Sequence, residues 1–245
     1  MLSPCFVRRF PSEFEALLSP AGRRVLSRRH PACGVLGTGA TRFVAERGLI
    51  TAAWARDGAA LLQRALGDCL FPMSDEIPAW TIGEMTENYG ELLPKTVRVE
   101  TALMASRKSR AWQRAGEIGL HAMLKSESFH AFAQSLSGFR LRKGWGTQVL
   151  RYSAGDYAGP HNDHHPEEPD ARDGYVDLHL SFCTPGVDHQ WLVYEQRNHF
   201  TGIQSVAKSG TVTCYRLPLW HYATPLVARR GKTAHRWVLL GTFLH

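Results

Sequence analysis

The stretch Gln148–Asp163 constrains the fold of this chain more than any other part of it. Its first residues are β-branched, leucine and aromatic types that suit a pleated, half-buried strand. Glycines and a proline then turn the chain. His161 and Asp163 follow this turn directly. The stretch therefore predicts a strand, then a turn, and then two polar side chains, those of His161 and Asp163, that lie close together.

These polar side chains are suited to hold a metal ion. Residues at i and i+2 of an extended segment point to the same side, so His161 and Asp163 should converge. With one more imidazole they would form a two-histidine, one-carboxylate triad, which leaves open positions on iron(II). His221 is the best candidate for that third ligand. His164 would point away on an extended segment, whereas His165 would share the side of Asp163 and remains an alternative.

From Lys143 onward the sequence reads as short strands separated by turn residues, a pattern typical of a sandwich or jelly roll. A double-stranded β-helix of this kind has a mouth into which several strands project side chains, which would let His161 and His221 share one metal. The clearest predicted strands are Gly146–Tyr152, Tyr175–Phe182, Gln190–Tyr194, Gly210–Leu217 and His235–Phe243.

The preceding part reads as helices, with apolar residues at three- and four-residue spacing. We predict an α+β protein in which residues 1–142 form a mainly helical extension packed outside the jelly-roll (cupin-like) core of residues 143–245, as one structural unit. One segment, Thr96–Met104, alternates as a strand does. The predicted helices are Phe14–Leu26, Ala53–Leu66, Ser109–Leu124 and Ser128–Leu136.

Composition narrows the class of protein. The chain has 245 residues, 44% hydrophobic and 21% charged, as expected of a globular protein with a sizeable core. Its net charge of +7 hints weakly at an acidic partner, but the basic residues are scattered, which favours solvated faces over a nucleic-acid site. Five widely spaced cysteines without a Cys-x-x-Cys pair argue for a reducing compartment and against a zinc ribbon. With no apolar run long enough for a signal peptide or a membrane span, we expect a cytoplasmic protein.

Three blocks of the second half, in order, resemble one known family. The chain is similar over roughly residues 143–243 to the iron(II)- and 2-oxoglutarate-dependent oxygenases, most of all to their prolyl-hydroxylase-like branch. The blocks are Tyr152-x-x-Gly155 leading to Pro160-His161-Asn162-Asp163, Gly210 to Tyr215 followed by Trp220-His221, and Pro225-Leu226 followed by Gly231 and Arg236-Trp237.

The resemblance implies a catalytic site and its cofactors. His161, Asp163 and His221 would hold iron(II), and 2-oxoglutarate would chelate the metal beside a position for O2. The implied reaction is hydroxylation, or another oxidation, of an unactivated C–H bond of an amino acid, peptide or small metabolite, with release of succinate and CO2. Ascorbate is a candidate reductant. Nucleic acid is a less favoured partner, and the sequence does not predict the primary substrate.

The far carboxylate of 2-oxoglutarate needs a buried cation, which a guanidinium pairs with bidentately. Arg236 is the first choice, although its spacing from His221 is longer than is usual in related enzymes. Lys232 is the alternative, followed by Arg229 or Arg230. Tyr152 could donate its hydroxyl to the same carboxylate, or be a plain core residue.

Other interpretations remain open at this stage. A metal-dependent hydrolase could use His161, Asp163 and His165 to activate water, and a non-catalytic jelly-roll binding protein could carry a vestigial cluster. His179 shares one face of a predicted strand with Ser181, where it would either line the pocket or face solvent. The charged segment Pro166–Asp173 is either a substrate lid or a solvated loop.

Overall fold

The computed structural model describes residues 9–76, 96–102, 104, 106–163 and 174–245. The helices, including two short 3-10 turns (η), are η1 Phe14–Leu17, α1 Pro20–Leu26, η2 Val35–Thr38, α2 Ala52–Leu66, α4 Arg110–Glu117, α5 Leu120–Leu124 and α6 Glu127–Ser137. The strands of the first half and the centre are β1 Phe43–Glu46, β2 Leu70–Glu76, β3 Thr96–Ala102, β4 Gly146–Ser153, β5 Tyr157–His161 and β6 Tyr175–Cys183. The remaining strands are β7 Val187–His189, β8 Trp191–Gln196, β9 His199–Ser205, β10 Thr211–Arg216, β11 His221–Ala223, β12 Val227–Ala228 and β13 His235–Leu244.

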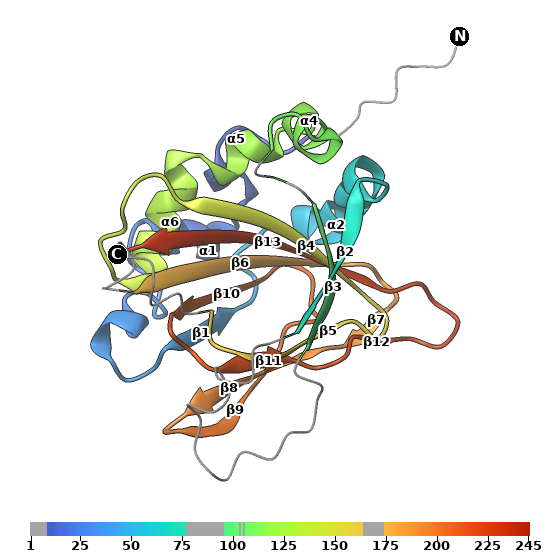
Figure 1. Cartoon of the computed structure of the whole chain (residues 1–245). Helices are drawn as coiled ribbons and strands as arrows, with labels where there is room; N and C mark the ends of the chain where they lie inside the picture. Colours follow the sequence, from blue (N-terminus) through green and yellow to red (C-terminus); the bar gives the residue numbers. More distant parts are fainter. Residues whose placement is uncertain (1–8, 77–95, 103, 105, 164–173) are drawn as a thin grey trace.

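These strands build a double-stranded β-helix, as predicted. An antiparallel sheet of eleven described strands runs in the order β1-β10-β6-β13-β4-β3-β5-β11-β8-β9, with β2 added beside β3. The sheet folds over on itself, because β3 pairs with β4 through its end and with β5 through its start. Figure 1 shows the two resulting layers, with β10, β6, β13 and β4 in one and β5, β11, β8 and β9 in the other. The space between the layers is where the candidate site lies.

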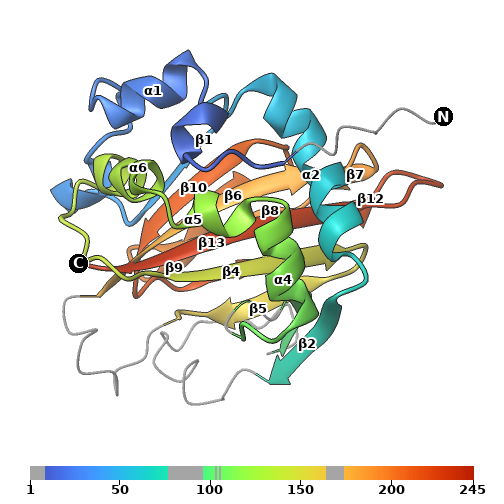
Figure 2. The ribbon, with the colours of Figure 1, turned by 90° about the horizontal axis from the view of Figure 1, so that it is seen from above.

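The helices cover the outer face of the larger layer (Figures 1 and 2). Strand alternation separates the two faces of β13, whose Trp237, Leu239 and Phe243 are fully buried under the helices. Aromatic contacts join the helices to the larger layer, since the Phe129 ring of α6 lies 5.8 Å from Phe243 of β13 and 5.2 Å from Phe14 of η1. The opposite face of β13 is thereby free to line the interior of the β-helix.

Two of the predicted helices are interrupted. The segment Phe14–Leu26 contains η1 and α1, because Ser19 caps α1 by accepting a hydrogen bond from the Gly22 amide and Pro20 occupies its first turn. The segment Ser109–Leu124 contains α4 and α5, which Gly119 separates with a φ of 78°. The predicted helices Ala53–Leu66 and Ser128–Leu136 are present as α2 and α6.

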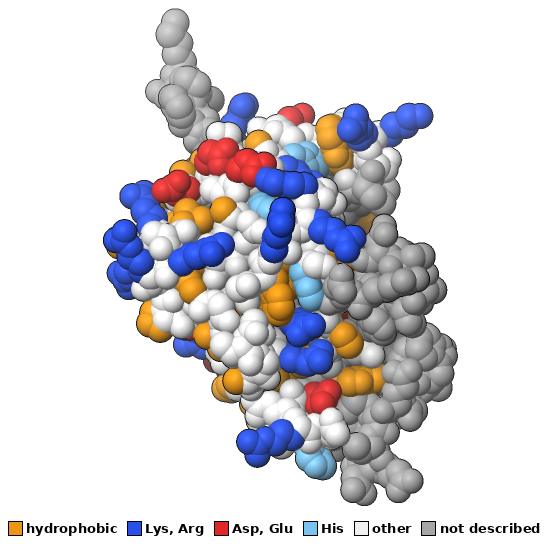
Figure 3. Space-filling model, turned by 90° about the vertical axis from the view of Figure 1, so that its left-hand side faces the viewer, with side chains coloured by type: hydrophobic (Ala, Val, Ile, Leu, Met, Phe, Trp, Pro, Cys, Tyr) orange, Lys and Arg blue, Asp and Glu red, His pale blue; other side chains and the backbone are white. Residues whose placement is uncertain are grey.

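The N-terminal part also contributes strands to the sheet. Strand β1 pairs antiparallel with β10, and β2 pairs antiparallel with β3. Of the three N-terminal strands β1, β2 and β3, the sequence predicts only β3. No described helix is long and apolar enough to cross a membrane. On the face shown in Figure 3, lysine and arginine side chains are spread among neutral and apolar ones and do not form one patch.

Helix α2 approaches the sheet closely at Gly58. A Cβ added there would lie 2.4 Å from a ring carbon of Phe182 on β6. We therefore expect Gly58→Ala to lower the free energy of unfolding by about 1–3 kcal/mol, as overpacked core sites do. Urea unfolding followed by circular dichroism measures this. Ala60→Ser at an exposed position of the same helix is the control, with an expected change of at most about 0.5 kcal/mol. An equal loss in both variants would contradict the close packing.

Candidate metal centre

Two histidines face each other across neighbouring strands. His161 ends β5 and His221 begins β11, and the antiparallel register pairs them directly. Directly opposed residues hold their side chains close together, and the two imidazole ring centroids lie 4.4 Å apart. Sheet register therefore brings together two residues that are distant in sequence.

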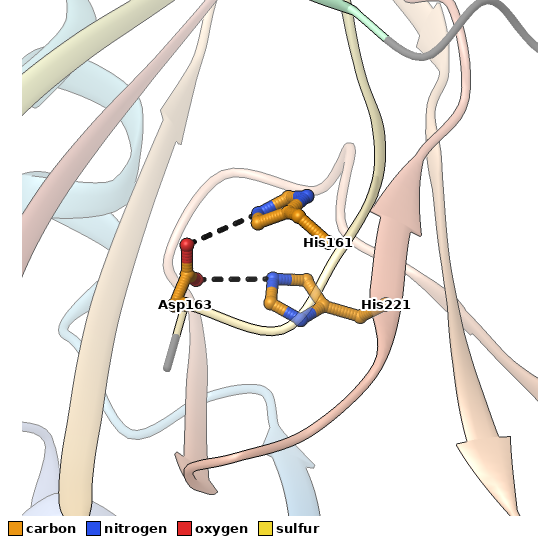
Figure 4. Close-up of side chains that lie close together, drawn as sticks. All are labelled: His161, Asp163 and His221. Atoms are coloured by element: carbon orange, nitrogen blue, oxygen red, sulfur yellow. Dashed lines mark ion pairs between the residues drawn. The ribbon is translucent and has the colours of Figure 1, made fainter. Parts of the chain in front are cut away.

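Asp163 completes the cluster through a turn of the backbone, which the sequence did not predict. The strand ends at His161, and Asp163 has a φ of 51°, in the left-handed region that aspartate tolerates better than most residues. The expectation of a continuous extended segment is thus wrong here, because the chain turns after the strand. The turn still directs the carboxylate back toward the imidazoles (Figure 4), with Oδ1 3.4 Å from His161 Nε2 and Oδ2 3.6 Å from His221 Nε2.

The backbone orients both imidazoles. His161 Nδ1 lies 2.6 Å from the Gly159 carbonyl oxygen, and His221 Nδ1 lies 2.7 Å from that of Leu219. A carbonyl oxygen can only accept, so each Nδ1–H is the donor and each neutral ring carries its lone pair on Nε2. Hydrogen bonds of this kind fix the tautomer and ring orientation of metal-binding histidines. The structure thus presents two Nε2 lone pairs to one point.

The charge states also suit metal binding. Burial and the neighbouring His161 lower the pKa of His221 to about 4, so this imidazole is neutral near pH 7. Partial desolvation opposes ionisation of Asp163, whose side chain is 41% exposed, but His161 and His221 outweigh it and hold the pKa of the carboxyl well below its usual range. Burial would likewise lower the pKa of His161, yet Asp163 reverses this and raises it. A carboxylate and a neutral imidazole are ligand forms that a divalent metal needs.

The cluster fits a divalent metal ion. One ligand atom from each of His161, Asp163 and His221 lies within 4.8 Å of the others. Two nitrogens and one oxygen on one side of a point are the donor set of the facial triad. The structure brings these three predicted residues together. His164, His165 and the predicted lid Pro166–Asp173 lie outside the described residues.

A cavity of about 370 Å³ opens beside the triad and continues between the two layers. Arg236, on β13, lines this cavity and is 4% exposed. Its Nε donates to Ser181 Oγ at 3.1 Å and its Nη1 donates to Gln190 Oε1 at 2.9 Å. The guanidinium carbon lies 5.3 Å from the centroid of the Tyr152 ring, which lines the same cavity. The predicted cation and the predicted tyrosine are thus adjacent.

The other candidate cations are placed differently. Lys232 is exposed and lies in the turn before β13, and Arg229 and Arg230 are exposed beside it. None of the three is among the described residues that line the cavity. The longer spacing from His221 to Arg236 therefore reflects the turn between β12 and β13.

Three polar residues of the interior were not singled out from the sequence. Gln190 is fully buried and binds Arg236, whereas Asp177 and Tyr215 line the cavity next to His179. Asp177 shares the strand face of His179, so alternation was the signal that could have found it. Gln190 and Tyr215 carry no comparable local pattern.

No protein-family model matches the sequence, and no curated protein matches it either. Solved structures do match. A protein from Burkholderia pseudomallei described as an oxidoreductase of the 2OG-Fe(II) oxygenase family aligns over 91% of this chain and 90% of its own, with a TM-score of 0.51 and 14% identity. The non-heme alpha-ketoglutarate-dependent epimerase SnoN from nogalamycin biosynthesis aligns over 91% of this chain and 82% of its own, with a TM-score of 0.50 and 14% identity.

A prolyl-4-hydroxylase from Pseudomonas putida aligns over 86% of this chain and 97% of its own, with a TM-score of 0.49 and 16% identity. At these identities the first two alignments establish the architecture. The described chain has the double-stranded β-helix fold of the 2OG-Fe(II) oxygenases.

Proposed function

We propose that this protein is an iron(II)- and 2-oxoglutarate-dependent dioxygenase that oxidises a C–H bond of a small molecule or peptide. The observation that carries the proposal is the arrangement of two sites in one cavity. The triad His161, Asp163 and His221 can hold the metal, and Arg236 offers a buried cation within the same space. An oxygenase of this type needs both.

Arg236 is proposed to bind the far carboxylate of 2-oxoglutarate. Among the described residues no carboxylate forms an ion pair with this guanidinium, whose two hydrogen-bond acceptors are the neutral Ser181 and Gln190. Burial lowers its pKa, which is the expected effect on a cation without a counter-ion. A buried charge is costly unless it is paired, so the site favours an anionic ligand. Tyr152 is proposed to donate its hydroxyl to the same carboxylate.

Each group of residues in the cavity would have a separate role in the reaction. When bound, the iron supplies activation of O2 coupled to oxidative decarboxylation of 2-oxoglutarate to succinate and CO2. His161, Asp163 and His221 would hold the metal through three ligand atoms and leave it able to bind further ligands. Arg236 orients the co-substrate. Apolar lining residues such as Leu150, Leu192 and Val238 limit access of water to the site.

Hydroxylation is the outcome that we propose first. SnoN is described as an epimerase, so the shared fold is not restricted to hydroxylases.

The N-terminal part contributes to the cavity through Met73 of β2 and through Val97 and Val99 of β3. We therefore propose that residues 1–142 shape substrate access and function as one unit with the core.

The test is turnover of 2-oxoglutarate by the purified protein with iron(II), O2 and ascorbate. We expect succinate release that depends on iron(II), rises with a matching substrate from a panel of amino acids, peptides and small metabolites, and is lost in His161→Ala. Absence of succinate from a metal-loaded protein across the panel, together with metal-dependent hydrolysis of an ester or amide, would replace the oxygenase with a hydrolase.

A further inference from the structure

A second polar cluster lies in the cavity beside the metal centre. Tyr215 of β10 and His179 of β6 are joined by a hydrogen bond of 2.8 Å between the phenol oxygen and Nε2. Asp177 lies opposite Tyr215 in the register, with its Oδ2 3.8 Å from the same Nε2. The Tyr215 ring contacts both His179, at 4.9 Å between centroids, and His221, at 5.1 Å. The Tyr215 ring therefore lies in contact with both His179 and His221, a proposed metal ligand.

The cluster occupies the opposite end of the larger layer from Arg236. In the pairing of β6 with β13, Asp177 lies across from Thr242, whereas Arg236 lies across from Cys183. Six residues of strand separate these two positions, or about 20 Å at about 3.3 Å per residue. Both Arg236 and Asp177 line the cavity. A co-substrate that binds at Arg236 therefore leaves the part of the cavity beside Asp177 for another ligand.

Asp177 is only partly paired, because its polar neighbours, His179 and Thr242, act on the carboxylate without reaching Oδ1. It is 4% exposed, and its Oδ1 is buried without a hydrogen-bond donor. The 3.8 Å separation of Oδ2 from His179 is too long for a hydrogen bond. Burial raises the pKa of Asp177, although His179 acts in the opposite direction. Leaving a buried carboxylate in this state is unfavourable, which is typical of groups kept for binding rather than stability.

The charges of the cavity can be assigned one by one. Its described lining contains one guanidinium, Arg236, and two carboxylates, Asp163 and Asp177. In the proposed function Asp163 binds the metal and Arg236 pairs with 2-oxoglutarate. Asp177 remains, with only the long contact to His179 to offset its charge and with Oδ1 unbonded. Tyr175 and Tyr215 line the cavity on either side of it, and aromatic faces beside a carboxylate favour cations.

We propose that Asp177 recognises a cationic nitrogen of the primary substrate, an ammonium or guanidinium group, and that Tyr215 and His179 complete this subsite. The proposal rests on the proposed function, because the metal and the co-substrate account for the other two charges. It assigns the substrate class as an amine- or guanidine-bearing small molecule or side chain. The positive net charge of the chain hints instead at an acidic partner, but its basic residues are scattered, whereas Asp177 lies inside the cavity.

The experiment compares three probes of equal chain length: n-hexylammonium, 1-hexanol and hexanoate. Dissociation constants are measured by ligand-observed NMR, under nitrogen, on the metal-free protein and on the protein loaded with iron(II) and 2-oxoglutarate. We expect wild type to bind n-hexylammonium at least about tenfold more tightly than 1-hexanol in both states, in line with a charge-assisted hydrogen bond, and more tightly than hexanoate once 2-oxoglutarate occupies Arg236. Asp177→Asn should bind n-hexylammonium and 1-hexanol about equally. Asp188→Asn, an exposed aspartate on β7, is the matched control and should keep the wild-type preference.

Thermal melting separates binding from a structural role. Because Asn has the same shape without the buried charge, Asp177→Asn should melt no lower than wild type. In wild type itself n-hexylammonium should raise the melting temperature more than 1-hexanol does, a readout that needs no variant. Equal binding of the probes by wild type, or a preference that survives Asp177→Asn, would overturn the proposal.

The two proposals fail in different ways. Absence of the charge-transfer absorption of an iron-bound 2-oxo acid in wild type would contradict the oxygenase proposal, while the cation preference is still measured on the metal-free protein. Normal absorption with no cation preference would contradict only the role of Asp177.

Discussion

Replacing His161, Asp163 or His221 with alanine should abolish tight iron(II) binding. Each residue offers one of three possible ligand atoms that lie within 4.8 Å of one another. Two remaining ligands cannot hold one face of an octahedral ion, so the loss should exceed the roughly 100-fold that removal of an outer-shell partner costs. Anaerobic equilibrium dialysis against iron(II) measures the affinity directly.

The matched control is His189→Ala, which removes a half-exposed imidazole that pairs with Asp188 on β7. This variant should bind iron(II) as wild type does. The three triad variants should also retain the far-ultraviolet circular dichroism of wild type, because the ligands lie at strand ends and not within the helix-covered core. Stoichiometric metal in any one triad variant would exclude that residue from the ligand set.

Replacing Arg236 with alanine should weaken 2-oxoglutarate binding more than any other change outside the triad. Removing one partner of a buried, hydrogen-bonded charge pair costs about 2–5 kcal/mol, or roughly a 30- to 5,000-fold rise in Kd. Arg236→Lys should recover part of this loss, since it keeps the charge but not the bidentate geometry. Anaerobic calorimetry with iron(II)-loaded protein gives the constants.

Lys232→Ala is the decisive comparison for this assignment. Lys232 is exposed in the turn before β13, so its replacement should leave the Kd for 2-oxoglutarate unchanged. Iron(II) affinity in the absence of 2-oxoglutarate should be the same in both variants and in wild type. A large loss in Lys232→Ala with little change in Arg236→Ala would reverse the assignment of the co-substrate cation.

The fold was predictable because its strongest signals are local. Alternating strands and turn residues after Lys143 predict the jelly roll, and β6 and β13 appear with nearly the predicted bounds. Strands β1 and β2 were missed because their place in the sheet depends on partners far away in the sequence, β10 and β3. Such pairing leaves little local trace.

The candidate site was predictable in its residue types but not in its geometry. His161 and Asp163 come together through a turn with positive φ at Asp163, not through the alternation expected of an extended segment. Tertiary pairing of β5 with β11 brings in the third residue of the cluster, His221. The lack of a hydrogen-bond donor to Asp177 Oδ1 becomes visible only when burial and hydrogen bonds are known, so no sequence pattern could have shown it.

The most direct test of the proposed dioxygenase is an anaerobic titration of iron(II) and then 2-oxoglutarate into the metal-free protein, followed by visible absorption. We expect the metal-to-ligand charge-transfer band of a chelated 2-oxo acid. The band should be absent in His161→Ala and should require far more 2-oxoglutarate in Arg236→Ala. Tight iron(II) binding without any such band at saturating 2-oxoglutarate would contradict the co-substrate, and with it the proposed dioxygenase.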